Sequence, residues 1–423
     1  MTFILFLSFF ILLVMNVPIA FSLFISSTLA LIYGGIPLVA VVQRAVTATD
    51  SFVLLAIPFF MFAGNLMGAG GISNRLIQLA DASVGWIKGG LAHVNVLTSM
   101  MFAGITGSAV ADTSSEGTII IPAMKKAGYD ADFSVGVTCC SSVIGVIIPP
   151  SIPFVLYGVV TGVSIGKLFL GGFIPGILVG LSQMAISYYL AKKHNYGTIT
   201  KFSFRNLYKN FISSFFAIIM PLVIVGGISF GIVTPTEAAI LATVYALILG
   251  FFVYKELNLE MMPKLLLDSV KMTAIVMFMI AGAYMYGWVI TNDQIPQKIV
   301  QLVSSFTSSP QVVLIMLVVV YLITGMFLDL GAAIILLCPI FFPLTQAMGI
   351  DPLFFGIVTV ISLAIGLVTP PVGACLFIAC KIGDVPLMAG AKASLPFILA
   401  IVGLLILFIL FPQIVLALPN ALL

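Results

Sequence analysis

Apolar segments of helical length follow one another along almost the whole chain, and the longest polar-rich stretch is only 192–210. A helix needs about 20 apolar residues to cross the hydrocarbon core of a bilayer. Charged residues make up 7% of the 423 residues, whereas soluble domains contain about 25%. So few charges cannot solvate a surface that faces water. The sequence therefore excludes a soluble enzyme, a nucleic-acid binder and a disordered scaffold, and it predicts an all-α polytopic membrane protein.

Two apolar segments, 89–124 and 310–345, are interrupted near their middle by GITGSAVADTSS and GMFLDLG. Limbs of about 15 residues reach only about 22 Å, too short for a full crossing. We interpret both segments as re-entrant helical hairpins, and two full spans with a charged kink are the alternative. The segments long enough to cross the bilayer are 3–33, 52–68, 132–160, 168–190, 211–230, 236–254, 273–290, 353–380 and 386–411. The first of these could be one span kinked at Pro18 or a span plus a shallow helix.

Basic residues indicate the orientation of the spans, because loops rich in Lys and Arg stay in the cytoplasm. The richest cluster contains Lys192, Lys193, Lys201, Arg205 and Lys209. This cluster places the loop 192–210 on the cytoplasmic side. No charge follows Lys392, which fits a C-terminus on the outer side.

The chain contains an internal repeat, because 104–178 can be superposed on 325–399 without a gap. The identities concentrate on Gly and Pro, the residues that set backbone geometry. Lys125 and Lys126 follow the first hairpin, whereas Gln346 and Ala347 occupy the equivalent positions after the second. The two copies should therefore be inverted relative to one another. Inverted repeats with interrupted helices are typical of secondary transporters, which bind their substrates near the midplane.

Each repeat also contains a span broken by a Pro-Pro pair, in SSVIGVIIPPSIPF (141–154) and SLAIGLVTPPVGAC (362–375). Two prolines remove backbone donors and push the preceding residue out of the helical conformation. Free carbonyls are then expected near Gly145, Ile148, Gly366 and Thr369, and a sodium ion can satisfy such groups at membrane depth. The half-helices that start at Ser151 and Val372 would attract an anion. A simple proline kink in a scaffold helix is the alternative.

The hairpin tips add oxygen ligands to these breaks. The first tip offers the hydroxyls of Thr106, Ser108, Thr113, Ser114 and Ser115. Asp112, Glu116 and Asp329 are ionisable groups inside apolar segments, where they are costly and so indicate function. Asp112 could instead cap the second limb of its hairpin. Asp329 stands where the first repeat has Ser108, which suggests that one tip is adapted to sodium and the other partly to substrate.

Four stretches resemble one known family: GITGSAVADTSSEGTIIIPAMKKAGYD (104–130), IGVIIPPSIPFVLYG (144–158), GIVTPTEAAILA (231–242) and GLVTPPVGACLF (366–377). The chain is similar over essentially its whole length to the large membrane subunit of tripartite ATP-independent periplasmic (TRAP) transporters. The resemblance implies a non-enzymatic subunit of the bacterial inner membrane. It also implies sodium-coupled elevator transport of an organic acid, such as sialic acid or a C4-dicarboxylate.

The resemblance further implies two partners, a small membrane subunit of four helices, which would be separate or cleaved away, and a periplasmic substrate-binding protein. It implies two or more sodium ions and no nucleotide. The first sodium site would use Thr106, Ser108, Gly145, Ile148 and Pro150, and the second would use Gly325, Gly366 and Thr369. Substrate would lie between the tips, where the candidate contacts are Ser108, Asp112, Thr113, Ser114, Ser151, Asp329 and Thr369.

The resulting division of the chain has four parts. Residues 1–70 would be N-terminal scaffold helices, and 71–191 would be the first transport repeat, with hairpin 89–124 and broken helix 132–160. Residues 192–272 would hold the cytoplasmic loop and central scaffold helices, and 273–423 the second repeat, with hairpin 310–345 and broken helix 353–380. Two other functions remain open, a stand-alone sodium–carboxylate symporter without a binding protein and a channel or structural subunit.

Overall fold

The computed structural model describes residues 1–197 and 201–422, with all side chains in these ranges except those of residues 40 and 41. The described residues form helices and no strands. Seven helical segments are long and apolar enough to cross a membrane: Phe52–Ala69, Ile165–Lys193, Phe204–Ser229, Pro235–Val253, Met262–Asn292, Leu330–Ala347 and Leu387–Leu410. The predicted polytopic helical architecture is therefore confirmed.

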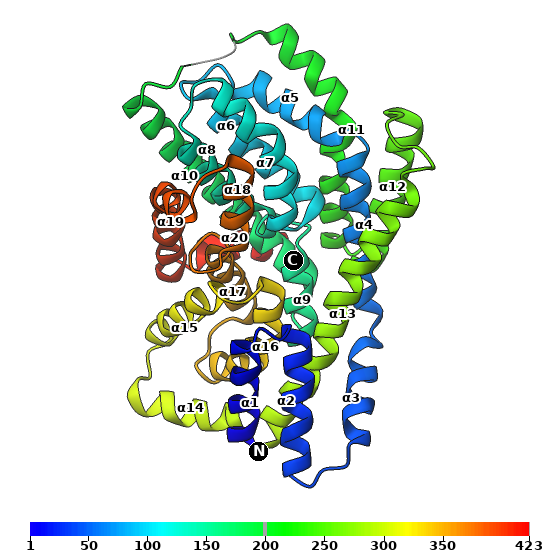
Figure 1. Cartoon of the computed structure of the whole chain (residues 1–423), viewed down its shortest axis with the longest axis vertical. Coiled ribbons are helices and arrows are strands. Elements are labelled where there is room, and N and C mark those ends of the chain that lie inside the picture. The colour runs from blue at the N-terminus through cyan, green and yellow to red at the C-terminus, as the bar shows by residue number, and fades with distance from the viewer. Residues whose placement is uncertain (198–200, 423) are drawn as a thin grey trace.

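Six consecutive helices occur twice in the same order, and each helix of the second set follows its counterpart at a nearly constant separation in sequence. The first set is α5 (Ile72–Val84), α6 (Gly90–Thr106), α7 (Ala109–Lys126), α8 (Ala131–Ser142), α9 (Ile152–Thr161) and α10 (Ile165–Lys193). The second set is α14 (Ile295–Phe306), α15 (Pro310–Gly325), α16 (Leu330–Ala347), α17 (Pro352–Gly366), α18 (Ala374–Gly383) and α19 (Leu387–Leu410). Figure 1 places α5 and α6 toward one end of the long axis and α14 and α15 toward the other, as inverted copies require.

Each repeat contains one helical hairpin and one broken helix, as the sequence predicts. The limb α16 has 18 residues, however, and is among the helices long enough to cross a membrane, so the predicted limb of about 15 residues is too short there. Limbs α6 and α7 are separated only by 107–108, and limbs α15 and α16 by 326–329. The turn of 3₁₀-helix η2 (Val143–Val146) extends α8, and the chain is then non-helical until α9. The second break lies between α17 and α18, and both Pro-Pro bonds are cis. Every residue of α17 from Leu353 to Gly366 is buried, so the broken helices form the centre of the molecule.

The segment 3–33, which the sequence left as one kinked span or a span plus a shallow helix, is not one continuous helix. The structure has two separate helices, α1 (Thr2–Val14) and α2 (Ile19–Tyr33), which pack against each other. The chain reverses at Asn16, which has a left-handed φ of 60°, and Pro18 then caps α2. Proline fits the start of a helix better than its interior because it lacks a backbone donor. This apolar stretch with one proline therefore contains a turn between two helices instead of one kinked helix.

Other helices complete a layer beside the repeats. After the 3₁₀ turn η1 (Phe52–Leu55), α4 (Ala56–Ala69) packs against α12 (Pro235–Ile248) and α13 (Met262–Asn292) along one side of Figure 1. A π-helical turn, η3 (Leu249–Val253), extends α12, and α11 (Phe204–Ser229) precedes it. The short helices α3 (Val39–Thr49) and α20 (Gln413–Leu422), like α5 and α14, were not predicted. They are too short or too polar to register as spans.

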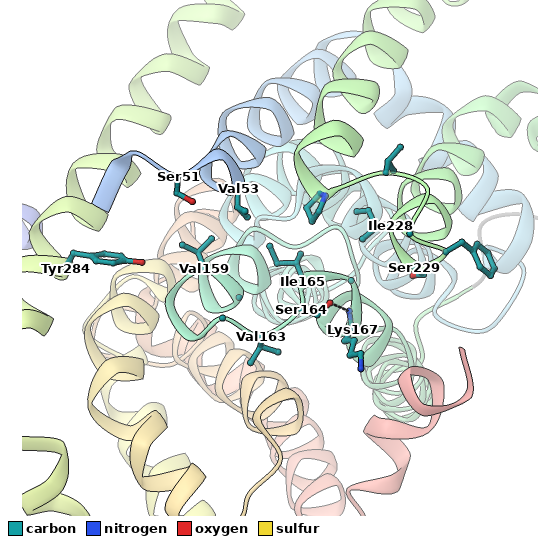
Figure 2. A pocket seen from close by; sticks show the side chains of 17 residues that line it. Ser51, Val53, Val159, Val163, Ser164, Ile165, Lys167, Ile228, Ser229 and Tyr284 are labelled. Atoms are coloured by element: carbon teal, nitrogen blue, oxygen red, sulfur yellow. Dashed lines mark hydrogen bonds between the residues drawn. The ribbon is translucent and has the colours of Figure 1, made fainter. Parts of the chain in front are cut away.

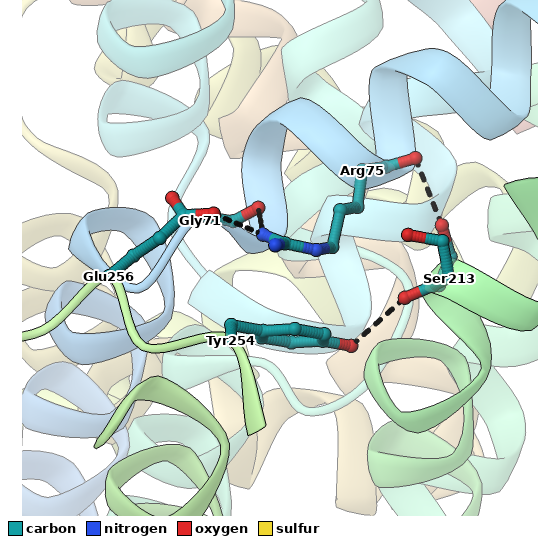
Figure 3. A network of polar contacts seen from close by, with 6 residues as sticks. Gly71, Arg75, Ser213, Tyr254 and Glu256 are labelled. Carbon is teal, nitrogen blue, oxygen red and sulfur yellow. Dashed lines mark hydrogen bonds and ion pairs between the residues drawn. The ribbon is translucent and has the colours of Figure 1, made fainter. Parts of the chain in front are cut away.

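Helix α5, which leads into the first hairpin, is fastened to this layer by Arg75 (Figure 3). Its guanidinium donates to the carbonyl of Gly71 at 2.7 Å and to Glu256 Oε1 at 2.6 Å. It also lies 4.0 Å from the ring centre of Tyr254, whose hydroxyl donates to the carbonyl of Ser213. The ion pair and the cation–π contact hold the start of the first repeat against α11 and the end of η3.

Candidate functional site

The first hairpin tip is built by Ser108, which caps α7. Its backbone is extended, and its side chain accepts from the backbone N–H of Ala111 at 3.4 Å. Serine is a favoured residue at this position because its hydroxyl satisfies an N–H that the helix leaves free. The capping role that Asp112 could have filled therefore belongs to Ser108.

This tip lies directly against the first helix break. A side chain at Gly107 would meet the carbonyl oxygen of Pro150 and the backbone of Ser151, and Gly107 itself has a left-handed φ of 61°. Only glycine combines that conformation with so close an approach. Ser151 is buried, and its hydroxyl donates to the carbonyl of Val146 at 2.6 Å. Thr106, Ser108, Gly145, Ile148 and Pro150 are thus distributed over two chain segments that touch.

Asp112 is fully buried at this junction. Thr106 Oγ1 donates to its Oδ1 atom, and Oδ2 has no hydrogen-bond partner. A Cβ atom at Gly145 would collide with Oδ2, so the carboxylate lies against the backbone of the broken helix. A buried charge is stable only when something compensates it. The hydroxyl, carboxylate and carbonyl oxygens gathered here are the ligands that a hard cation prefers, and therefore the residues present fit a sodium ion.

The second tip repeats the backbone arrangement with different side chains. Gly325 packs directly on Gly366, and the carbonyl of Met326 accepts from the backbone N–H of Val372 at 3.3 Å. Asp329 caps α16 and accepts from the backbone N–H of Gly331 at 3.0 Å. Thr369 Oγ1 donates to the carbonyl of Ile365 at 2.7 Å. The residues of the second predicted sodium site, Gly325, Gly366 and Thr369, therefore also lie at one junction.

Both tips reach the same cavity, which has a volume of about 380 Å³. Ser108 lines it from the first tip, and Asp329 lines it from the second. These two residues occupy equivalent positions in the repeats and are far apart in sequence. The remaining wall is mostly apolar and comes from α2, α4, α9, α13 and α16. A concave, mainly apolar space with a few convergent polar groups is the usual form of a small-molecule site.

A second cavity of about 330 Å³ adjoins the first tip and shares Met61, Ser108, Ile152 and Met272 with the cavity between the tips. Thr106, Ser114 and Ser115 line it, opposite Asn65 on α4. Asn65 Nδ2 donates to Ser269 Oγ of α13 at 2.8 Å. Asn65 was not among the predicted site residues, because a single amide on an apolar helix makes no pattern.

Four predicted substrate residues line neither of these two cavities. Asp112, Thr113 and Ser151 are buried behind the tip, and Thr113 Oγ1 donates to the carbonyl of Ala109 in its own helix. Thr369 lies at the second break, outside the lining of both cavities. Ser108, Ser114 and Asp329 are the predicted substrate residues that the structure places on a cavity wall.

A larger hollow of about 750 Å³ lies where α10 and α12 begin and α11 ends (Figure 2). This is the end of α10 and α11 opposite the described basic residues Lys192, Lys193 and Arg205. Ser51, Ser164, Ser229 and Tyr284 contribute hydroxyls, and Lys167 is the charged residue among those that line it. Figure 2 shows Lys167 beside Ser164, which caps α10.

A family model described as the tripartite ATP-independent periplasmic transporter, DctM component, matches residues 6–414. The chain belongs to this family. It is 38% identical over 406 residues to the sialic acid TRAP transporter large permease protein SiaM of Vibrio cholerae, covering 96% of this chain and 95% of the relative. It is 40% identical over 372 residues to the C4-dicarboxylate TRAP transporter large permease protein DctM of Pseudomonas aeruginosa, covering 88% and 87%.

The fold is also found in a solved structure, the YdaH transporter of Alcanivorax borkumensis. The TM-score is 0.66 with 14% identity, over 89% of this chain and 88% of the other. At that identity the likeness shows the fold alone. The family membership shows that this chain is the large permease component of a TRAP-type secondary transporter, a multi-pass protein of the bacterial inner membrane and not an enzyme.

Proposed function

We propose that this subunit imports an organic acid in symport with sodium. The observation that carries the proposal is the convergence of two inverted hairpin tips on one cavity, beside the buried carboxylate of Asp112, whose Oδ2 atom has no hydrogen-bond partner among the described residues. A transporter needs this arrangement because ion and substrate must bind close enough to affect one another. Sialic acid and C4-dicarboxylates, named for the two relatives, are the candidate substrate classes.

In the first repeat, sodium would be held by Thr106, Ser108, Gly145, Ile148 and Pro150. In the second repeat it would be held by Gly325, Gly366 and Thr369. A cation at the first site would offset the negative charge of Asp112 and fix the tip against the break. Because Ser108 belongs to both that site and the cavity, ordering the tip would prepare the carboxylate site, which gives positive coupling between the two ligands.

The substrate would lie between Ser108 and Asp329, with Ser114 within reach in the adjoining cavity. The hydroxyl of Ser108 can donate to a substrate carboxylate, and Asp329 can accept from a substrate hydroxyl. Asp112, Thr113, Ser151 and Thr369 would support these contacts from behind the cavity wall.

Two partners would complete the transporter, a small four-helix membrane subunit and a periplasmic binding protein that delivers the acid. The hollow around Lys167 supports delivery from outside, because it lies opposite the basic residues at the other ends of α10 and α11 and offers a cation to an arriving anion. The two hairpins and the two broken helices would form the moving transport unit, and the segments 3–33, 52–68, 211–230 and 236–254 would form the scaffold. This unit would move across the membrane relative to the scaffold, which is an elevator mechanism.

Uptake into proteoliposomes tests the proposal. They would contain this chain and its small subunit, with binding protein and labelled sialic acid or succinate outside, with and without an inward sodium gradient. We expect uptake only when both sodium and the binding protein are present. Uptake with sodium but without the binding protein would support the stand-alone symporter instead. Uptake indifferent to sodium would refute the coupling.

A further inference from the structure

Behind the first hairpin tip, polar side chains from three helices form a buried hydrogen-bonded network. Ser99 Oγ of α6 donates to Glu116 Oε2 of α7 at 2.7 Å and lies 3.0 Å from Ser141 Oγ of α8. Ser141 donates to Asn95 Oδ1, and Asn95 Nδ2 donates to Thr138 Oγ1 at 2.6 Å. These five side chains are 0% or 1% exposed. The network therefore lies in the interior of the first repeat, away from both cavities.

The network contains a carboxyl group and no cation. Glu116 Oε1 has no hydrogen-bond partner, and neither has the buried hydroxyl of Thr98 on the adjoining helix. Within the part of the chain that the structure describes, Glu116 forms no ion pair. A fully ionised carboxylate in this position would keep one oxygen without a donor, which is among the costliest arrangements in a protein interior.

The elements packed around α7 supply no positive charge to Glu116. On α7 itself the nearest charged group is Asp112, one helical turn earlier. Helix α6 contributes His93, whose ring approaches Tyr188 on α10. Helix α18 contributes the buried Cys375 and Cys380 and the exposed Lys381, and η2 has no titratable residue. Helix α8 contributes the exposed Asp132 and the buried Cys139 and Cys140, which contact Ser394. The electrostatic environment of Glu116 is therefore negative and apolar.

The second repeat shows that the fold does not need this carboxyl. Leu337 of α16 is the residue equivalent to Glu116, while Thr359 and Ser362 preserve the types of Thr138 and Ser141. Helices α7 and α16 are both 18 residues long and pack in matching hairpins. In the second repeat Val320 and Met316 replace Ser99 and Asn95, so the carboxyl and its hydrogen-bond partners are absent together while the hairpin still forms. This indicates that the carboxyl has a role other than folding.

We propose that Glu116 is a proton-binding site whose proton leaves when a cation binds at the first hairpin tip. This inference rests on the sodium coupling proposed above. Residues one turn apart on a helix have Cβ atoms about 5–6 Å apart, so Glu116 and Asp112 repel each other when both are ionised. A proton on Glu116 removes this repulsion, and the hydrogen-bonded network can hold the protonated carboxyl without additional space.

A cation at the tip offsets the charge of Asp112, so that Glu116 can ionise at a lower cost. One positive charge then enters the repeat as sodium and another leaves as a proton to water. Binding of the two ions is linked reciprocally, and each weakens the other. Sodium should therefore bind more tightly as pH rises, because deprotonated Glu116 adds negative charge beside the tip.

Calorimetry on the purified complex with its small subunit measures this exchange. Sodium chloride is titrated at pH 7 in two buffers of different ionisation enthalpy, which reports the protons released per sodium bound. We expect at least about 0.3 proton per sodium from the wild type and less than half of that amount from Glu116→Gln. Glu116→Leu, which copies the second repeat, should behave like Glu116→Gln. Glu260→Gln removes an exposed carboxylate and is the matched control, with release equal to that of the wild type.

A second measurement follows the sodium concentration for half-maximal binding. From pH 6 to pH 8 it should fall about threefold in the wild type and much less in Glu116→Gln. Sodium binding with equal proton release in the wild type and both Glu116 variants would overturn this inference and leave sodium coupling intact. Absence of sodium binding in the wild type would refute sodium coupling itself, and this inference with it.

Discussion

The hairpin α6–α7 carries hydroxyls and two carboxyls along the limb that follows its tip, whereas the hairpin α15–α16 has Asp329 at its tip and then an apolar limb as far as Phe342. Limbs, caps and contacts with the helix breaks are otherwise closely alike. The backbone therefore does not require polar side chains, since α16 forms without them. We therefore expect ion binding mainly at the first hairpin, and the predictions below test that expectation.

Replacing the buried carboxylate at the first tip should have the largest effect. Asp112→Asn keeps the shape but removes the charge that a cation at Thr106 and Gly145 would neutralise. Loss of an interaction with a charged group costs about 1.5–3 kcal/mol, so sodium-driven uptake should fall about 10- to 100-fold. The measurement is initial uptake in proteoliposomes. Ala333, which is equivalent to Asp112, offers the control Ala333→Ser, which should transport normally. Sodium dependence preserved in Asp112→Asn would contradict this expectation.

The tip of the second hairpin should matter for substrate more than for sodium. Asp329→Asn can still cap α16 but is a poorer acceptor, so the half-saturating concentration of substrate should rise about tenfold while sodium activation changes less than twofold. Ser108→Ala at the equivalent position should shift both quantities, because Ser108 belongs to the tip and to the cavity. Measuring both dependences in each variant separates the roles. If Asp329→Asn transports like the wild type, its charge is dispensable.

A smaller effect is expected at the helix breaks. Thr369 of the second repeat occupies the position equivalent to Ile148 of the first. Thr369→Ile copies the first repeat and removes one hydroxyl, so apparent sodium affinity should fall about three- to tenfold. Thr369→Ser retains the hydroxyl and should keep the wild-type affinity. The sodium dependence of uptake distinguishes the two variants. Equal sodium curves for both would show that the hydroxyl is not used.

The smallest effect is expected at α5 and α14, the two helices that lead into the hairpins. Arg75 fastens α5 through Glu256 and Tyr254, and Lys298 occupies the similar place on α14. Arg75→Gln should lower the free energy of unfolding by about 1 kcal/mol, since exposed ion pairs and cation–π contacts contribute little. Lys298→Gln serves as the control and should change stability less. Thermal unfolding of the purified complex measures both, and equal midpoints would show that the Arg75 contacts add no stability.

The hairpins and helix breaks could be predicted from sequence because glycine and proline set them directly. Gly107 needs a left-handed backbone against Pro150, and the Pro-Pro pairs cannot continue a helix. The turn at Asn16 was not located, and the break within 3–33 stayed one of two alternatives, because the apolar pattern continues on both sides of Asn16. Helices α5 and α14 were missed because short, half-polar helices resemble loops in a search for spans.

The cavity wall was predictable only in part. Ser108 and Asp329 could be singled out as equivalent polar residues in an apolar repeat. Their meeting in one cavity depends on packing between segments that are distant in sequence, which local patterns do not encode. Asn65, Met61 and Met272 reach the cavities from helices of the adjoining layer, and their residue types carry no signal in an apolar span.

The most direct test of the account is whether substrate occupies the space between the two tips. In the part of the chain that the structure describes, the five native cysteines are all buried. A cysteine at Val276, which lines the cavity but is not among the proposed sodium or substrate residues, can therefore be labelled selectively with a small membrane-permeant thiol reagent in a Val276→Cys variant. We expect sodium together with the transported acid to slow labelling at least about threefold, and the acid without sodium to have little effect. A labelling rate unchanged by sodium and acid would contradict the placement of the substrate between Ser108 and Asp329.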